Sequence, residues 1–401
     1  MVSMPSPARL QSASHLKKII HLPTDVGGNA QNLSRQMRKL GVTSNSLVVQ
    51  GSFLNYGGDA VLGTAKTNPL ILEIKRLMAF GYVFRYDIAF FNFGQTLYAP
   101  TAPSASDSRL KRTVRHVRNF FYRRMQRLEL QILRWRGCTL VIQYQGSDAR
   151  QGSALRELYS DSHVNDVEAN YYSLASDEHK REQIALITPR CKQVYALNPD
   201  LLNVLPPGSR FLPYANVDLE DWIPNFRARQ SGNLRVGHAP THRAIKGTEY
   251  VLQAIERLQA MGWPVELVLV EGVTNAQARK TYESIDVLVD QLLVGWYGGI
   301  AVELMAMGKP VVAYVREADL IHIPREMAQE LPVIQSTPKT LEKVLVKLLE
   351  LPNANWELLQ RRSRSYVEKW HNPMVVAEGI LADLAEIECD STSTEDTSNP
   401  P

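Results

Sequence analysis

The segment from Gly295 to Val312 reads Gly-Trp-Tyr-Gly-Gly-Ile-Ala-Val-Glu-Leu-Met-Ala-Met-Gly-Lys-Pro-Val-Val. Its glycines precede an apolar stretch that we expect to form a helix from about residue 300 to 307. Gly308 and Pro310 end that helix before a valine-rich strand. Backbone amides at a glycine-rich helix start can approach an anion, and the helix dipole favours negative charge there. We therefore predict a phosphate-binding turn that consists of Gly298, Gly299 and Ile300.

The carboxylate of Glu303 is expected in the first turn of the same helix, where it can accept hydrogen bonds from a ligand. A single Glu in a first turn is also common without any ligand, so a plain helix charge is the alternative.

Short apolar runs alternate with amphipathic stretches along the rest of the chain, which is typical of parallel βα units. In the first half we expect strands at 18–22, 46–50, 139–143, 193–197 and 211–212, and a helix at 29–40. In the second half we expect strands at 234–237, 265–270, 286–289 and 311–315, and further helices at 247–261, 339–349 and 355–370.

The chain of 401 residues is too long for one ordinary core. We predict an α/β protein with two Rossmann-like domains that face each other across a cleft, where ligands bind beyond the carboxyl ends of the strands. The domains are expected at 17–222 and 234–388, with a linker at 223–233. Residues 1–16 and 389–401 are rich in small and polar residues and are expected to be a disordered lead and tail.

Composition excludes several classes of protein. The net charge of +4 is small for this length and does not indicate a nucleic-acid partner. The three cysteines lie far apart, which argues against a zinc site or a disulfide framework and fits a reducing cytosol. We find no uninterrupted apolar stretch of about 18 residues, the length of a membrane span. We therefore expect a cytoplasmic protein without a bound metal.

Two further loops carry residues suited to an anionic ligand. Gly27, Gly28 and Asn29 follow the first strand and open a helix. Arg243 and Lys246 follow the first strand of the second half, where an arginine fork and a lysine point charge suit a pyrophosphate. His238 precedes this loop and can donate a hydrogen bond. The alternatives are an ordinary βα turn for the first loop and a solvated surface loop for the second.

Several of these segments together resemble glycosyltransferase family 4. The run from Glu303 to Val312 is similar to the family's "EAMA-G-PVV" signature, and Lys246-Gly247 is similar to its "EKG" lysine. Residues 27–29, 213–218 and 367–373 resemble its N-terminal glycine loop, its "PNGVD" turn and its final helix. The resemblance covers roughly 20 to 375 in the right order.

The resemblance implies a GT-B fold and transfer of a sugar from a nucleotide-diphosphate donor, with retention and without a metal or other cofactor. The acceptor is expected to be a polysaccharide, a glycolipid or another small molecule. Gly27, Gly28, Asn29, His238, Arg243, Lys246, Gly298, Gly299, Ile300 and Glu303 are the predicted donor-binding residues.

The chain departs from the family pattern at two positions. Gly295 stands where the family has a first carboxylate, and Thr241 stands where it has a phosphate-binding arginine. A non-catalytic scaffold or regulatory subunit with the same fold is therefore an alternative, and a sugar-nucleotide epimerase is a third reading.

The segment Gln145-Gly146-Ser147-Asp148-Ala149-Arg150 is similar to an "HGSD-R" segment of some family relatives, with Gln145 at the place of the His. We predict that Asp148 and Gln145 act at the reacting centre, and that Arg150 helps to orient a sugar. The alternative for Asp148 is a cap of the following helix.

Residues 109–136 contain ten Lys and Arg residues against one acid, Glu129. Apolar residues recur every three or four positions, as in a helix with one apolar stripe. Such a helix suits an anionic membrane surface or an anionic acceptor. A stripe packed in the core with solvated cations is the alternative, and nucleic acid is a weaker one. The predicted contacts are Arg112, Arg115, Arg118, Arg123, Arg124 and Arg127.

Overall fold

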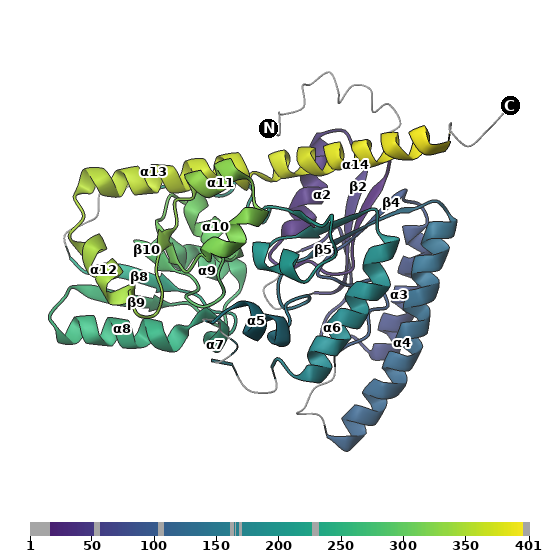
Figure 1. The fold of residues 1–401 in the computed structure, drawn as a ribbon, viewed down its shortest axis with the longest axis horizontal. Coiled ribbons are helices and arrows are strands. Elements are labelled where there is room, and N and C mark those ends of the chain that lie inside the picture. Colours follow the sequence, from purple (N-terminus) through teal and green to yellow (C-terminus); the bar gives the residue numbers. More distant parts are fainter. Residues whose placement is uncertain are drawn as a thin grey trace.

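The computed structural model describes residues 17–51, 57–102, 108–160, 164, 166–167, 171–226 and 232–395, with side chains up to residue 387. These residues form two parallel sheets with helices packed around each (Figure 1). The expected lead at 1–16 and part of the expected linker and tail lie outside the described residues.

The N-terminal sheet has seven strands in the order β3-β2-β1-β4-β5-β6-β7. Strand β1 lies at its centre, paired in parallel with β2 and β4. All four residues of β1 are buried, as expected for a strand covered on both faces. The strands are β1 Ile19–Leu22, β2 Ser44–Gln50, β3 Ala60–Gly63, β4 Ile88–Phe91, β5 Thr139–Tyr144, β6 Gln193–Ala196 and β7 Arg210–Phe211. The helices are α2 Asn29–Lys39, α3 Pro69–Val83, α4 Arg109–Trp135, α5 Gly152–Leu158 and α6 Leu174–Ile187.

The C-terminal sheet has five strands in the order β12-β11-β10-β8-β9, again all parallel. Its strands are β8 Leu234–His238, β9 Val265–Leu269, β10 Val287–Val289, β11 Val311–Ala313 and β12 Ile334–Gln335. Its helices are α7 Arg243–Lys246, α8 Thr248–Ala260, α9 Asn275–Tyr282, α10 Gly299–Ala306, α11 Arg325–Glu330, α12 Leu341–Leu349 and α13 Asn353–Trp370. The prediction of two Rossmann-like α/β units is confirmed.

Helix α10 differs from expectation at its start. It begins at Gly299, so Glu303 is its fifth residue and lies beyond the first turn, which contains no acid. Residues from Ala301 to Ala306 are all buried, because α10 packs against α13 and the strand that follows it. At the end of the helix Gly308 has a φ of 74°, and a Cβ there would lie 2.8 Å from the ring of Phe226. Glycine is therefore required at the turn into β11.

The C-terminal helix α14, Pro373–Glu395, returns to the N-terminal sheet. Figure 1 shows α13 and α14 in yellow, running across both halves of the molecule. α14 packs against α2, and the Asp383 carboxylate accepts hydrogen bonds from Tyr195 at 2.7 Å and Arg210 at 2.5 Å. The helix continues to Glu395, past residue 389 where we expected a disordered tail.

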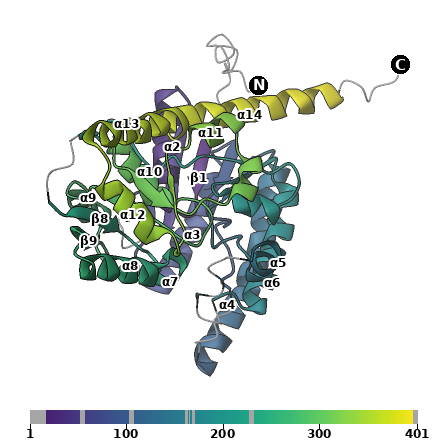
Figure 2. The same cartoon turned by 60° about the vertical axis from the view of Figure 1, so that its left-hand side comes forward.

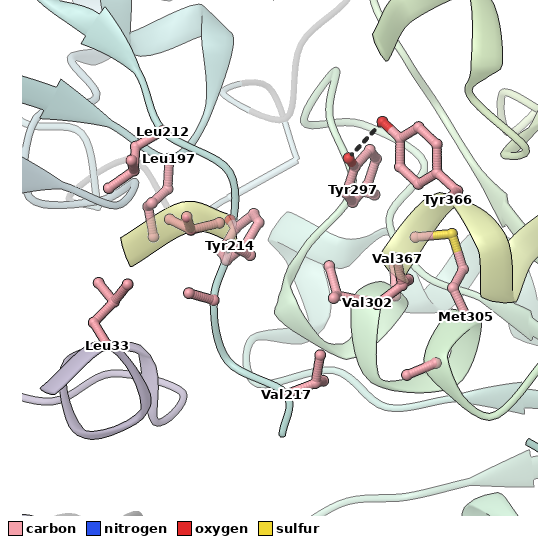
Figure 3. Packing of buried hydrophobic residues seen from close by; sticks show 14 of the residues in the cluster. Leu33, Leu197, Leu212, Tyr214, Val217, Tyr297, Val302, Met305, Tyr366 and Val367 are labelled. Atoms are coloured by element: carbon pink, nitrogen blue, oxygen red, sulfur yellow. Dashed lines mark hydrogen bonds between the residues drawn. The ribbon is translucent and has the colours of Figure 1, made fainter. Parts of the chain in front are cut away.

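One buried cluster joins the two halves (Figure 3). It combines Leu33 of α2 with Val302 and Met305 of α10. A hydrogen-bonded group lies within it, with His371 at its centre. The Nε2 atom of His371 lies 2.8 Å from the Tyr297 hydroxyl, and its Nδ1 atom lies 2.9 Å from the Tyr214 carbonyl oxygen. His371 therefore connects Tyr214, in the segment that leads into the C-terminal domain, to Tyr297 of the glycine-rich turn. Burial lowers the pKa of His371 to about 4.

We expect the free energy of unfolding to fall as the pH drops from 6.5 to about 4. The unfolded chain takes up a proton on His371 in this range, whereas the folded chain excludes it. This one group contributes at most about 3 kcal/mol. His371→Gln should make the decline shallower, which urea unfolding at a series of pH values would measure. The exposed His116 offers a control, since His116→Asn should leave the slope unchanged. An unaltered slope in His371→Gln would contradict the assignment.

Candidate functional site

The carboxyl ends of the two sheets meet through a short series of side-chain contacts. The Gln145 carbonyl after β5 accepts a hydrogen bond from Asn198, whose Oδ1 accepts one from the Tyr214 hydroxyl at 2.9 Å. The Tyr214 ring lies 3.9 Å from the place of a Cβ on Gly299. Asn216 Nδ2 donates to the Gly299 carbonyl at 3.0 Å. The loop after β5 and the glycine turn before α10 therefore lie on opposite sides of one junction.

Lys246 and the glycine turn come together around a buried carboxylate. The Lys246 ammonium lies 2.6 Å from Asp290, and the two side chains are 12% and 1% exposed. Asp290 also accepts a hydrogen bond of 2.6 Å from the backbone N–H of Gly298. A Cβ on Gly298 would lie 3.0 Å from Lys246 Nζ, so a side chain there would crowd the ammonium.

Asp290 is missing from the predicted site. It directly follows the buried strand β10, and an acid at that position is the signal that was available in the sequence.

Arg243 and Lys246 have different surroundings. The Arg243 guanidinium is half exposed and binds both carboxylate oxygens of Glu271, at 2.9 and 2.6 Å. It lines a cavity of about 530 Å³ together with Gly247, Tyr250 and other residues at the start of α8. Asp166, from the N-terminal half, lines the same cavity and accepts a hydrogen bond from the Tyr250 hydroxyl at 2.6 Å.

The ring of His238 is held by contacts within the C-terminal half, and its predicted contact with a donor stays a prediction. Its Nδ1 lies 2.8 Å from the Val289 carbonyl and its Nε2 lies 2.9 Å from the Thr248 hydroxyl. Both ring nitrogens are thus in use, and burial lowers the pKa of His238. The imidazole connects β8, β10 and the start of α8.

Glu303 and Gly295, at the two ends of the segment 295–303, have different neighbours. Glu303 is 3% exposed, and Asn275 Nδ2 donates to its Oε1 over 3.4 Å. Gly295 has a φ of 93°, and a Cβ there would collide with the guanidinium of Arg316. Arg316 forms an ion pair of 2.9 Å with Asp319 and stacks over Tyr159 of the N-terminal half, with 3.5 Å from Cζ to the ring centroid. A cation therefore stands beside the position where the family pattern has a carboxylate.

The first glycine loop is shaped by its own acid. Gly27 and Gly28 have left-handed φ values of 71° and 79°. The amides of Ala30 and Gln31 at the start of α2 donate to Asp25, at 3.2 and 3.1 Å. Burial raises the pKa of Asp25 to about 6. The amides at the start of α2, which we expected to bind an anionic ligand, thus donate to the carboxylate of Asp25.

Asn29 connects the first glycine loop to the segment that follows β7. Its Oδ1 accepts a hydrogen bond of 2.9 Å from the Ala215 amide, and its Nδ2 donates to the Val26 carbonyl at 2.9 Å.

Asp148 holds the loop after β5 in place. Its carboxylate accepts hydrogen bonds from the Gln145 amide at 2.9 Å and from the Gly146 amide at 2.6 Å. Burial raises the pKa of Asp148. The Gln145 side chain is buried, and its Nε2 has no hydrogen-bond partner among the residues that the structure describes. Asp148 thus caps its own loop instead of the following helix.

A cavity of about 930 Å³ opens beside Asp148 in the N-terminal half. It extends from the ends of β1, β4 and β5, where Thr24, Gln95 and Asp148 line it, to α3 and α4, where Leu70 and Phe121 line it. The cavity is therefore large enough for a small ligand and touches the predicted acceptor side.

The apolar stripe of α4 faces outward. The buried residues of α4 are Tyr122, Gln126, Glu129, Leu130 and Leu133, whereas Leu110 and Val117 are 75% and 68% exposed. The alternative of ordinary core packing is therefore wrong for most of the stripe. Arg115 donates to the Ala102 carbonyl, Arg118 donates to Thr101, Arg123 pairs with Glu182, and Arg124 lies over Phe120. Arg112 and Arg127 are exposed on the same helix.

Two kinds of feature are absent from the described part of the chain. No three or more His, Cys, Asp or Glu side chains gather closely enough there to hold a metal ion. No helix there combines the length and apolar character needed to cross a bilayer.

Arg150 is a buried structural cation, so we expect its loss to destabilise the fold. Its guanidinium binds both oxygens of Asp200, at 2.6 and 3.0 Å. Arg150→Met would leave Asp200 buried without its partner and should reduce the free energy of unfolding by about 3 to 5 kcal/mol. Chemical denaturation would measure the loss. The double variant Arg150→Met/Asp200→Asn should recover part of it, and an equal loss in both variants would contradict this role.

Comparison with known proteins gives matches in structure but none in sequence. No family model matches the chain, and no curated protein matches its sequence significantly. The structure is similar to sucrose-phosphate synthase from Thermosynechococcus elongatus, with a TM-score of 0.59 and 14% identity over 93% of this chain and 100% of that one.

Two further structures share this architecture. HepE of Anabaena, in complex with UDP-glucose, has a TM-score of 0.54 at 12% identity and covers 92% of this chain and 100% of its own. The catalytic domain of starch synthase IV from Arabidopsis thaliana, bound to ADP and acarbose, has a TM-score of 0.59 at 10% identity, over 93% of this chain and 99% of that one. At such identities the likeness concerns architecture. The chain has the GT-B fold of these structures, with two Rossmann-like domains that face each other across a cleft.

Proposed function

We propose that the protein transfers a sugar from a nucleotide-diphosphate donor to an acceptor. The observation that carries this proposal is the meeting of the Lys246 ammonium with the glycine turn at the start of α10. A cation and helix-terminal amides at one place suit a diphosphate, which carries its negative charge on several oxygens. The similar fold of HepE with UDP-glucose and of starch synthase IV with ADP is consistent with such a donor.

The same groups suit the departure of the nucleotide diphosphate. When the bond between the sugar and the diphosphate breaks, negative charge grows on the leaving oxygen, and preorganised donors stabilise it. Lys246 and the amides of Gly299 and Ile300 would supply that stabilisation without a metal ion. Asp290 would hold the ammonium in position, and Glu303 would accept a hydrogen bond from a hydroxyl of the donor. Retention of configuration and a role in polysaccharide or glycolipid assembly follow from the family resemblance.

The acceptor is proposed to bind in the cavity beside Asp148. Asp148 would contact the acceptor hydroxyl, and the unpartnered Nε2 of Gln145 would donate to the sugar or to Asp148 after a small rotation. The elevated pKa of Asp148 suits a group that exchanges a proton with a ligand.

One observation favours a non-catalytic scaffold instead. Arg316 stands beside Gly295, where the family pattern has a carboxylate. Slow hydrolysis of a nucleotide sugar would support the transferase, whereas a scaffold would cleave none. Conversion of the sugar while it remains on the nucleotide would indicate an epimerase.

Removal of the Lys246 charge should weaken nucleotide binding. Lys246→Met alone would leave Asp290 buried without its partner, so the informative variant is Lys246→Met/Asp290→Asn. We expect its affinity for UDP, GDP or ADP, whichever the native protein binds, to fall by roughly 10- to 100-fold. Isothermal titration calorimetry would measure the change. Lys343→Ala, an exposed lysine on α12, is the matched control. Unchanged affinity in the double variant would rule out the proposed donor site.

Asp148→Asn should separate the acceptor side from the donor side. The asparagine keeps one oxygen for the loop amides but cannot exchange a proton. We expect the turnover number for sugar transfer to fall by roughly 100-fold or more, with nucleotide affinity unchanged. A steady-state assay with release of the nucleotide diphosphate as the signal would test this. An unchanged turnover number would assign Asp148 to loop structure alone.

A further inference from the structure

Helices α3 and α4 expose matched apolar stripes. On α3, Leu70, Ile74 and Leu77 follow one another at helical spacing and are 76%, 61% and 58% exposed. On α4, Leu110, Val114 and Val117 have the same spacing and are 75%, 60% and 68% exposed. We call these six residues the docking face. Contiguous apolar side chains in this number are rare on the surface of a monomeric soluble protein unless they bind something.

The two helices lie side by side on the outer flank of the N-terminal sheet (Figures 1 and 2). The Tyr122 hydroxyl of α4 donates to Glu73 of α3, and Arg76 of α3 lies 5.2 Å from the centroid of the Tyr122 ring. Leu70 of α3 and Phe121 of α4 line the same cavity. The α3 stripe therefore begins at the mouth of that cavity, and Phe121, one helical turn beyond Val117, brings α4 to the same mouth.

The surface around the docking face is strongly basic. Helix α4 and its C-cap carry the ten cations of residues 109–136. The one acid of this segment, Glu129, is buried and accepts hydrogen bonds from the Leu97 and Tyr98 amides at 3.0 and 3.2 Å. It therefore presents no negative charge to the outside. A second copy of the chain would bring the same cations against each other, so charge disfavours a symmetric dimer through this face.

We propose that the docking face binds an anionic lipid bilayer, with the apolar stripes among the acyl chains and the arginines at the lipid phosphates. Amphipathic helices with cations beside an exposed apolar stripe have this preference. The cavity mouth would then open at the lipid surface. Given the proposed transferase function, the acceptor is an amphiphile drawn from that bilayer, with its polar end near Asp148.

Vesicle co-sedimentation of the full chain tests the docking face. We expect the native protein to sediment with vesicles of phosphatidylcholine and phosphatidylglycerol, and much less with vesicles of phosphatidylcholine alone. Arg112→Gln/Arg127→Gln should weaken binding to the anionic vesicles by roughly thirtyfold, since each cation near such a surface contributes a factor of about five. Ile74→Ser/Val117→Ser should also weaken binding, because it removes apolar area from the face.

Leu358→Ser/Arg362→Gln is the matched control. It makes the same kinds of exchange at exposed positions of α13, and it should bind vesicles as the native protein does. The proposal is overturned if the native protein stays in solution with anionic vesicles, or if the control loses as much binding as the variants of the face. Sedimentation equilibrium that shows a dimer, lost in Ile74→Ser/Val117→Ser, would assign the face to a second copy. Nucleotide binding, measured separately, would show whether the donor site fails or holds independently of this result.

Discussion

The buried carboxylate of Asp290 holds the C-terminal site together. A charge with 1% exposure is strongly destabilising unless it is paired, and Asp290 meets this requirement with one ammonium and one backbone amide. These two partners come from α7 and from the turn before α10. The requirement to pair one charge therefore brings two loops, distant in sequence, to the same point. Gly298 permits this approach, because it has no side chain to crowd Lys246.

In the N-terminal domain, two loops are likewise held by a carboxylate that accepts hydrogen bonds from backbone amides. Asp25 receives the first amides of α2, and Asp148 receives two amides of the loop after β5. Both loops are thus formed before any ligand arrives. An anionic ligand at the start of α2 would have to compete with Asp25, whose elevated pKa shows that its charged form is poorly solvated. Protonation of Asp25 would weaken that competition.

The fold could be predicted from local patterns because buried parallel strands are short apolar runs and because Gly308 and Pro310 mark a helix end. Strands β3, β4 and β12 were not anticipated, since they depend on pairing with neighbours in the sheet. Lys246 and Gly298, which we predicted for one donor site, lie close together, and their contact with a donor stays a prediction. The Val289 carbonyl beside His238 and the guanidinium beside Gly295 could not be predicted, because they come from residues 51 and 21 positions away. The exposure of the apolar side chains of α3 was also not predictable, because it depends on whether another element of the fold covers the helix.

The chain crosses between the domains twice, once before β8 and once where α13 gives way to α14. The two crossings touch, since His371 lies 2.9 Å from the carbonyl of Tyr214. Two connections at separate points would fix an axis, but two that coincide act as a single pivot. We would expect a relative rotation of the two domains to centre on His371. Contacts between the halves away from this point, such as the hydrogen bond of Tyr250 with Asp166, would then be the ones that break.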